Sequence, residues 1–143
     1  MKLFIHLGYP KTASTFLNSN FFSKHNQVNL ITENEEAGSF IQSIKYLDED
    51  RYEKEKLKII SFFESKILEK KINIFSDEMF LVPLGYKLYD NKNAIKRLYE
   101  IFLSIQKIKD IKFLLMIRKP EELFLSYYTD EYHRIIFHDK NLD

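Results

Sequence analysis

The stretch LGYPKTASTFL, from Leu7 to Leu17, decides the fold of this chain. The apolar run before it, Leu3–Leu7, predicts a buried strand, and the pattern from about Thr15 to Lys24 predicts a helix. Backbone N–H groups at the start of such a helix, together with the helix dipole, form a ready anion site. The stretch is therefore a candidate phosphate-binding loop.

The lysine of this loop does not stand where a nucleoside triphosphatase places it. That motif reads G-x-x-x-x-G-K-[ST], whereas here Lys11 follows Gly8 by three residues, and Ala13 and Ser14 replace the second glycine and its lysine. The magnesium-binding arrangement is not reproduced, so the sequence disfavours an ATP or GTP hydrolase. Hydroxyl donors come from three side chains: Thr12, Ser14 and Thr15.

Further strands are predicted by short apolar runs at Val28–Ile31, Ile72–Ser76 and Ile111–Ile117. The last run is continuous, which is typical of a strand that is covered on both faces. Because helical patterns separate these runs, we expect one α/β domain over residues 1–143, with a mainly parallel sheet flanked by helices.

The helical patterns are of unequal strength. Apolar residues recur at helical spacing from Asp50 to Lys71 and from Asn93 to Lys109. Asn34–Ser39 is interpreted as a polar loop before a weak helix that ends near Leu47, and Pro120 suits the first turn of a last helix. The stripe expected to face the core in the first long helix is Leu57, Ile60, Phe63 and Ile67.

Composition narrows the function classes. The 143 residues carry a net charge of +1 and no cysteine, so we expect no nucleic-acid partner, no disulfide and no thiolate metal site. The four histidines show no ligand spacing, and no metal is proposed. His6 is expected in the core. The sequence contains no signal-peptide pattern and no run of about 20 apolar residues, so we expect a cytoplasmic protein without a transmembrane segment.

Tyr9–Thr15 resembles the 5′-phosphosulfate loop of the sulfotransferase family, which reads Y-P-K-[TS]-[GA]-[TS]-[TS]. Ala13 stands where glycine is commonest. Alanine is strained there if the backbone needs a positive φ, and harmless if the position belongs to the first helical turn. The resemblance implies that the loop binds the nucleotide 3′-phosphoadenosine 5′-phosphosulfate (PAPS) through Pro10, Lys11, Thr12, Ala13, Ser14 and Thr15.

A second motif of that family, R-x-P-x-x-x-x-x-S, holds the 3′-phosphate and is matched by Arg118 and Ser126. An arginine offers phosphate a forked donor. Taken singly, Arg118 could instead form a surface ion pair, and Ser126 could bond to its own helix. Both motifs on the expected elements, in the expected order, strengthen the resemblance.

The end of the predicted strand Ile72–Ser76 supplies a candidate base. In parallel sheets ligands bind beyond the carboxyl ends of the strands, where Ile72–Ser76 runs into Asp77 and Glu78. The resemblance implies Lys11 as the catalytic cation and Glu78 as the base, with a pKa raised toward neutrality by partial burial. Asp77 is the weaker alternative. A loop or helix-capping carboxylate is the structural alternative for Glu78.

The resemblance implies a P-loop NTPase-like fold and transfer of a sulfuryl group from PAPS to an acceptor hydroxyl or amine, on a carbohydrate or small metabolite, leaving 3′,5′-adenosine bisphosphate. Two alternatives stay open: another nucleotide-dependent phosphotransferase, and a non-catalytic nucleotide-binding remnant. The family pattern continues beyond the position of Asp143, so we expect the N-terminal part of a longer domain. An incomplete sheet edge would favour self-association.

Overall fold

In the computed structural model, the residues described are 1–8, 12–32, 34–82, 91–126 and 128–129. Their strands form one sheet in the order β2-β3-β1-β4, and every neighbouring pair is parallel. The strands are β1 (Lys2–Gly8), β2 (Val28–Leu30), β3 (Ile72–Asp77) and β4 (Asp110–Met116). The expected α/β class and parallel sheet are confirmed, and each expected strand lies within one residue of the observed bounds.

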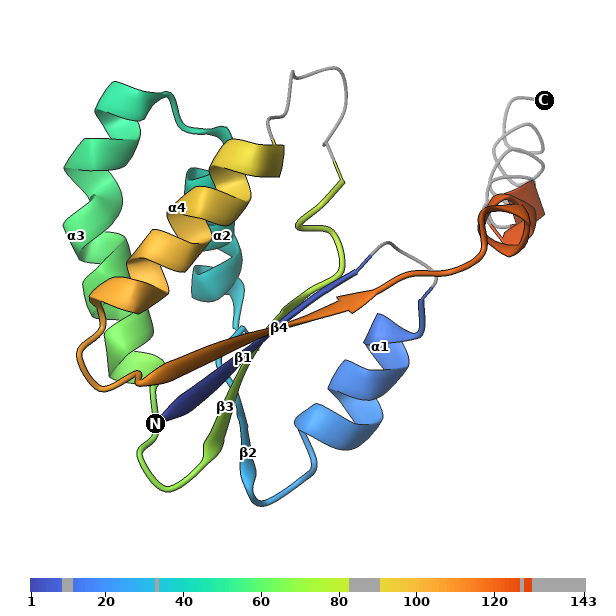
Figure 1. The fold of residues 1–143 in the computed structure, drawn as a ribbon, viewed down its shortest axis with the longest axis horizontal. Coiled ribbons are helices and arrows are strands. Elements are labelled where there is room, and N and C mark those ends of the chain that lie inside the picture. The colour runs from blue at the N-terminus through green and yellow to red at the C-terminus, as the bar shows by residue number, and fades with distance from the viewer. Residues whose placement is uncertain (9–11, 33, 83–90, 127, 130–143) are drawn as a thin grey trace, which may run out of the picture.

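Helices lie on both faces of this sheet. Figure 1 shows α1 (Ser14–Leu17) on one face, and α2 (Glu35–Tyr46), α3 (Glu49–Lys66) and α4 (Asn91–Ser104) on the other. A π-helical stretch, η1 (Asn18–Phe22), continues α1 directly, so the expected first helix is present with its second half wound more widely.

Alternating side chains of β1 enter two separate cores, because successive residues of a strand point to opposite faces. Leu3, Ile5 and Leu7 belong to the larger core, under α2, α3 and α4. Phe4 packs against the smaller core, which contains Phe22 of η1. We name these sides the three-helix face and the α1 face.

The polar segment expected to be a loop before α2 is helical instead. Asn34 caps the helix, since its side-chain oxygen accepts a hydrogen bond from the backbone N–H of Ala37 at 2.8 Å. Glu35 and Glu36 occupy the first turn, where the helix dipole favours negative charge. The loop interpretation of Asn34–Ser39 was therefore wrong, because these polar residues form a helix start.

The apolar stripe of α3 differs from the expected one at its first position. Leu57 is 76% exposed, whereas Ile59 is fully buried. The other fully or almost fully buried members of α3 are Tyr52 and Phe63. The stripe was misplaced because the sequence does not show at which angle a long helix meets its neighbours.

α3 also ends at Lys66, five residues before the expected end. The side chain of Asn73, at the start of β3, causes the early stop: its Oδ1 accepts from the N–H of Leu68 at 2.9 Å. Its Nδ2 donates to the carbonyls of Leu68 and Lys71, at 3.0 and 3.2 Å. These bonds hold the connection in a turn, so the helix cannot continue into the strand.

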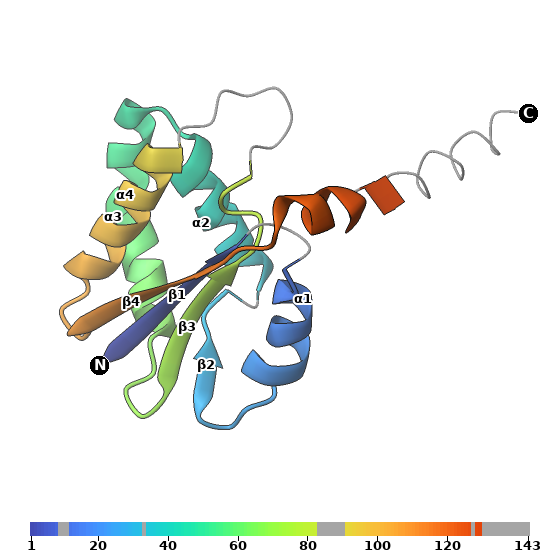
Figure 2. The ribbon, with the colours of Figure 1, turned by 45° about the vertical axis from the view of Figure 1, so that its right-hand side comes forward.

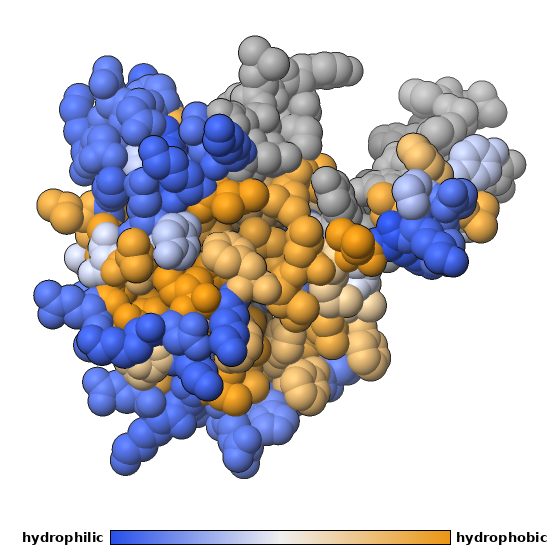
Figure 3. All heavy atoms as spheres, in the orientation of Figure 1, coloured by the Kyte–Doolittle hydropathy of each residue, from blue (hydrophilic) through white to orange (hydrophobic). Residues whose placement is uncertain are grey.

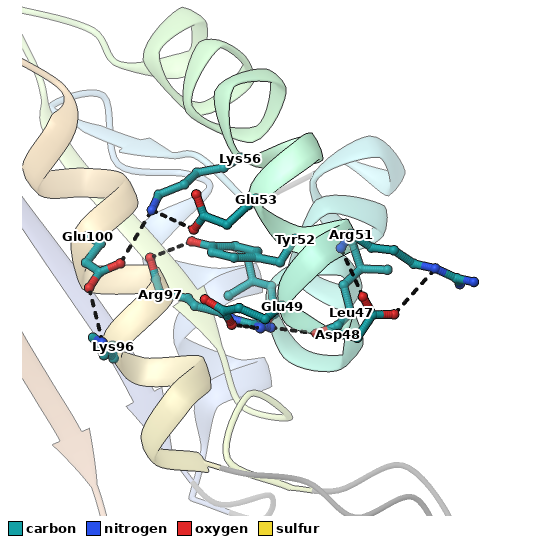
Figure 4. Close-up of polar contacts among 11 residues, drawn as sticks. Leu47, Asp48, Glu49, Arg51, Tyr52, Glu53, Lys56, Lys96, Arg97 and Glu100 are labelled. Carbon is teal, nitrogen blue, oxygen red and sulfur yellow. Dashed lines mark hydrogen bonds and ion pairs between the residues drawn. The ribbon is translucent and has the colours of Figure 1, made fainter.

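A buried arginine ties α2, α3 and α4 together, as Figure 4 shows. The guanidinium of Arg97, on α4, donates to the carbonyl of Leu47 at 2.8 Å and pairs with Glu49 at 2.5 Å. It also stacks over the ring of Tyr52, 4.2 Å from the ring centroid. α4 ends at Ser104, earlier than expected, because the chain turns there and leaves the helix axis.

β4 is the outer strand of the described sheet, and its side chains are not covered on both faces as expected. Phe113, Leu114 and Leu115 are 48%, 46% and 56% exposed. Figure 3 shows apolar side chains gathered over the face that contains β4. The expectation failed because a continuous apolar run does not reveal a strand's position in the sheet. Self-association through this edge stays a prediction.

The last helix begins at Pro120, as expected, and residues 120–126 are helical. Figure 2 shows this helix projecting from the carboxyl end of β4, away from the rest of the sheet. Within the described ranges, none of the helices has the length and apolar character needed to cross a membrane.

Candidate anion-binding site at the carboxyl edge of the sheet

The ends of β1, β3 and β4 meet at one edge of the sheet. Leu7 is paired in register with Asp77, and Gly8 with Met116. The parallel order therefore brings the three polar segments, after β1, β3 and β4, to the same side, as the sequence predicted.

Pro10 and Lys11 lie outside the described residues, and the described part of the loop begins at Thr12. The side chains of Thr12 and Ser14 are buried, and their hydroxyl oxygens are 3.3 Å apart. A Cβ atom on Gly8 would lie 3.0 Å from the Thr12 hydroxyl and 3.3 Å from the carbonyl of Met116. A larger residue at the end of β1 would therefore make tight contacts, and the Thr12 hydroxyl would have to shift by a few tenths of an ångström.

Ala13 adopts the left-handed conformation, with φ 65° and ψ 15°. Of the two readings of this position, the strained one is therefore correct. The residue precedes α1, and its carbonyl accepts a hydrogen bond from the N–H of Leu17 at 3.0 Å. A left-handed residue next to right-handed ones can turn successive N–H groups toward one point, which is how backbone nests bind anions.

Glu78 faces this loop. The hydroxyl of Thr15 donates to the Glu78 carboxylate, 3.2 Å from Oε1 and 3.4 Å from Oε2. Thr15 is the last residue of the loop motif, and Glu78 follows β3 directly. The structure thus brings together two residues that are 63 positions apart and that the resemblance assigned to one site.

Asp77 has a different environment. Its Oδ1 accepts from the N–H of Met79 at 2.8 Å, so it closes the turn after β3. Burial raises the pKa of Asp77, although nearby Lys45 opposes the shift. Lys45 is itself buried and donates to the carbonyls of Met79 and Val82, and burial lowers its pKa. These two residues stabilise the turn that presents Glu78.

A buried polar chain beneath Glu78 was missed by the sequence reasoning. Nδ1 of His6 lies 2.7 Å from the hydroxyl of Ser76, which donates to Oδ1 of Asn18 at 2.7 Å. Because the Ser76 proton goes to Asn18, His6 must donate through Nδ1. Burial lowers the pKa of His6, and Nε2 is buried without a hydrogen-bond partner in the described structure. The expected core position of His6 is confirmed.

The only sequence signal for this hydrogen-bonded series of side chains was a polar residue inside each of two apolar strands. These residues are His6 in β1 and Ser76 in β3. That these two residues are register partners follows only from the strand order, which the sequence does not show.

Arg118 follows β4 by two residues and so lies at the carboxyl edge. Its Nε donates to the carboxylate of Glu122, one helical turn on, at 3.2 Å. The surface ion pair considered from the sequence is therefore present. Ser126 lies on the last helix and is partly buried. The described residues include no group of three or more histidine or acidic side chains placed to hold a metal ion.

Comparison with known proteins assigns no family to this chain. No protein-family model matches the chain, and no curated protein or solved structure does so either. The functional argument therefore depends on the geometry of the site and on the loop motifs.

The left-handed backbone of Ala13 generates a stability prediction. Ala13→Gly should raise the free energy of unfolding by about 1 kcal/mol, because only glycine adopts this conformation without strain. The matched control is Ala94→Gly in α4, which should lower it by about 1 kcal/mol or more, since Ala94 is a buried helical residue. Urea denaturation measures both. A loss of stability in Ala13→Gly would contradict the strained conformation.

Proposed function

We propose that this chain is a sulfotransferase domain with a P-loop-like fold, which uses PAPS as its sulfuryl donor. The observation that carries the proposal is the hydrogen bond between Thr15 and Glu78. This bond joins a carboxylate to the loop whose sequence resembles the 5′-phosphosulfate loop. A carboxylate so close to bound phosphate and sulfate would serve as a proton acceptor.

The described residues fit a bound phosphosulfate. Gly8 leaves room for the Thr12 hydroxyl, and the left-handed Ala13 breaks the regular backbone just before α1. Thr12 and Ser14 offer hydroxyl donors, and the first N–H groups of α1 have no partner within a helix. Each of these neutral groups would donate a hydrogen bond to a phosphate or sulfate oxygen.

Each residue has a distinct part in the proposed reaction. When bound, PAPS supplies the sulfuryl group: a bond forms between sulfur and the acceptor oxygen or nitrogen as the bond between sulfur and the 5′-phosphate oxygen breaks. Glu78 takes the acceptor proton on a carboxylate oxygen. Lys11 stabilises the negative charge that collects on the leaving phosphate. Thr15 holds the Glu78 carboxylate toward the loop through its hydroxyl.

Arg118 and Ser126 would bind the 3′-phosphate. Arg118 is paired with Glu122, and both side chains are substantially exposed. An exposed ion pair of this kind contributes at most about 1 kcal/mol. A phosphate that accepts two charge-assisted bonds from the guanidinium would therefore displace Glu122 at little cost.

Isothermal titration with 3′,5′-adenosine bisphosphate, without magnesium, tests the nucleotide site. The chain should bind it, and Lys11→Ala and Arg118→Ala should each weaken binding about tenfold or more, because each removes a charged donor to phosphate. Matched controls are Lys58→Ala and Arg51→Ala on α3, whose ion pairs lie on the helix surface. These variants should bind as the wild type does.

Three results would count against the proposed function. Binding of magnesium-ATP in preference to the bisphosphate would favour the phosphotransferase alternative. Binding of the bisphosphate without any turnover would favour the non-catalytic remnant. Equal weakening by the α3 controls would show that the loop lysine and Arg118 have no special role.

The two neighbouring carboxylates give a second test, in a sulfate-transfer assay with labelled PAPS. Glu78→Gln should reduce kcat at least 100-fold with nucleotide affinity retained, because the amide cannot take the proton. Asp77→Asn should keep most of the activity, since the asparagine oxygen can still accept from the Met79 N–H. The reverse result would make Asp77 the base.

A further inference from the structure

A cavity of about 360 Å³ lies on the α1 face, between the helix that follows the loop and the ends of β2 and β3. Its volume falls within the range that small-molecule sites occupy. Its lining residues are Asn18, Ser19, Ser23, Leu30, Thr32 and Ser76. Nothing in the nucleotide site uses it.

The lining has an unusual composition for a site beside bound phosphate. It contains four hydroxyl groups, one amide and one apolar side chain, and none of the six residues is charged. Hydroxyls and amides both donate and accept hydrogen bonds. Such a lining matches a ligand that also carries many groups of both kinds, and it offers no counter-charge to an ammonium or a carboxylate.

The floor of the cavity is fixed by its own hydrogen bonds. The Thr32 hydroxyl donates to the carbonyl of Ser76 at 2.9 Å and accepts from its N–H at 3.3 Å. The Ser76 hydroxyl donates to Oδ1 of Asn18 at 2.7 Å, which fixes the amide plane. This bond holds the Asn18 amide at the cavity wall, so its Nδ2 is a positioned donor.

Glu78 lies beside this cavity along the strand direction. Ser76 is the penultimate residue of β3, and Glu78 is the first residue of the turn that follows this strand. Thr15 and Asn18 are three residues apart in the helical segment and so lie on the same side of it. The bond from Thr15 to Glu78 therefore lies next to the bond from Ser76 to Asn18, one step nearer the carboxyl edge.

We propose that the cavity is the acceptor subsite and that it takes an uncharged polyhydroxyl compound, a neutral sugar or polyol. Asn18 Nδ2 and the Ser19 hydroxyl would bind the ring hydroxyls, and Leu30 would contact the C–H face of the ring. The Ser23 hydroxyl, which donates to the Ser19 carbonyl at 3.1 Å, would accept a hydrogen bond from the ligand. The inference rests on the proposed function, because the acceptor role needs the base and the sulfuryl donor.

In the acceptor role, one hydroxyl of the bound sugar points out of the cavity toward Glu78. Its oxygen forms the new bond to sulfur, the bond from sulfur to the 5′-phosphate oxygen breaks, and the hydroxyl proton passes to the Glu78 carboxylate. The products are a sugar sulfate ester and 3′,5′-adenosine bisphosphate, so atoms and charge balance.

The test is a titration of the whole ¹⁵N-labelled chain, followed by amide shifts, with methyl β-D-glucopyranoside, methyl β-D-galactopyranoside and N-acetylglucosamine. Glucosamine, glucuronate and 4-nitrophenol are the cationic, anionic and aromatic comparisons. At least one neutral sugar should shift the amides of Ser19, Ser23 and Thr32 and bind more tightly than the three comparison compounds.

Variants separate the cavity from general effects on folding. Ser19→Leu fills the cavity from an exposed helix position and should weaken neutral-sugar binding about tenfold or more, the loss expected when one or two hydrogen bonds are removed. Asn18→Ala should do the same. Ser61→Leu, at an exposed position of α3, makes the same change elsewhere and should leave sugar binding unchanged.

Calorimetry with 3′,5′-adenosine bisphosphate on the same samples tests the nucleotide site separately from the sugar site. If the nucleotide binds but none of the neutral sugars shifts the cavity amides, the inference fails and the proposed function stands. If a neutral sugar binds in the cavity but the nucleotide does not bind, the sugar site stands and the proposed function fails. Preferred binding of a comparison compound would also overturn the inference.

Discussion

The parallel pairing of β1 with both β3 and β4 is the constraint on which the candidate site depends. Because both neighbours run in the same direction as β1, the chain must leave all three strands at the same edge of the sheet. The tight contact at Gly8 then fixes how closely the loop follows the strand end. Antiparallel pairing of β3 would send Glu78 to the opposite edge, away from Thr15, and antiparallel pairing of β4 would do the same to Arg118.

The change from strand to turn at the end of β3 gives two neighbouring acids different environments. Asp77 is fixed by the turn on its own side of the strand, with Lys45 near it, and burial raises its pKa. Glu78 instead faces α1 and accepts from Thr15. The two neighbouring carboxylates thus have separate partners, since Asp77 ends β3 and Glu78 begins the turn after it.

The sequence predicted the strands well, because short apolar runs between polar segments leave few alternatives. It predicted the loop and Glu78 as parts of one site, because parallel strands deliver their ends to one edge. It failed at Leu57 and along β4, where burial depends on helix orientation and on position within the sheet. It also missed the chain from His6 through Ser76, since strand order decides which residues are neighbours.

The most direct test of a two-phosphate site at this edge is to map bound 3′,5′-adenosine bisphosphate by amide shifts in the ¹⁵N-labelled chain. The account predicts that the largest shifts fall on Thr12–Thr15, after β1, and on Ile117–Lys119, after β4. Shifts confined to the opposite edge, around the cavity lined by Lys2 and Lys70, would contradict it. In that case the loop would be a structural helix start and not a nucleotide site.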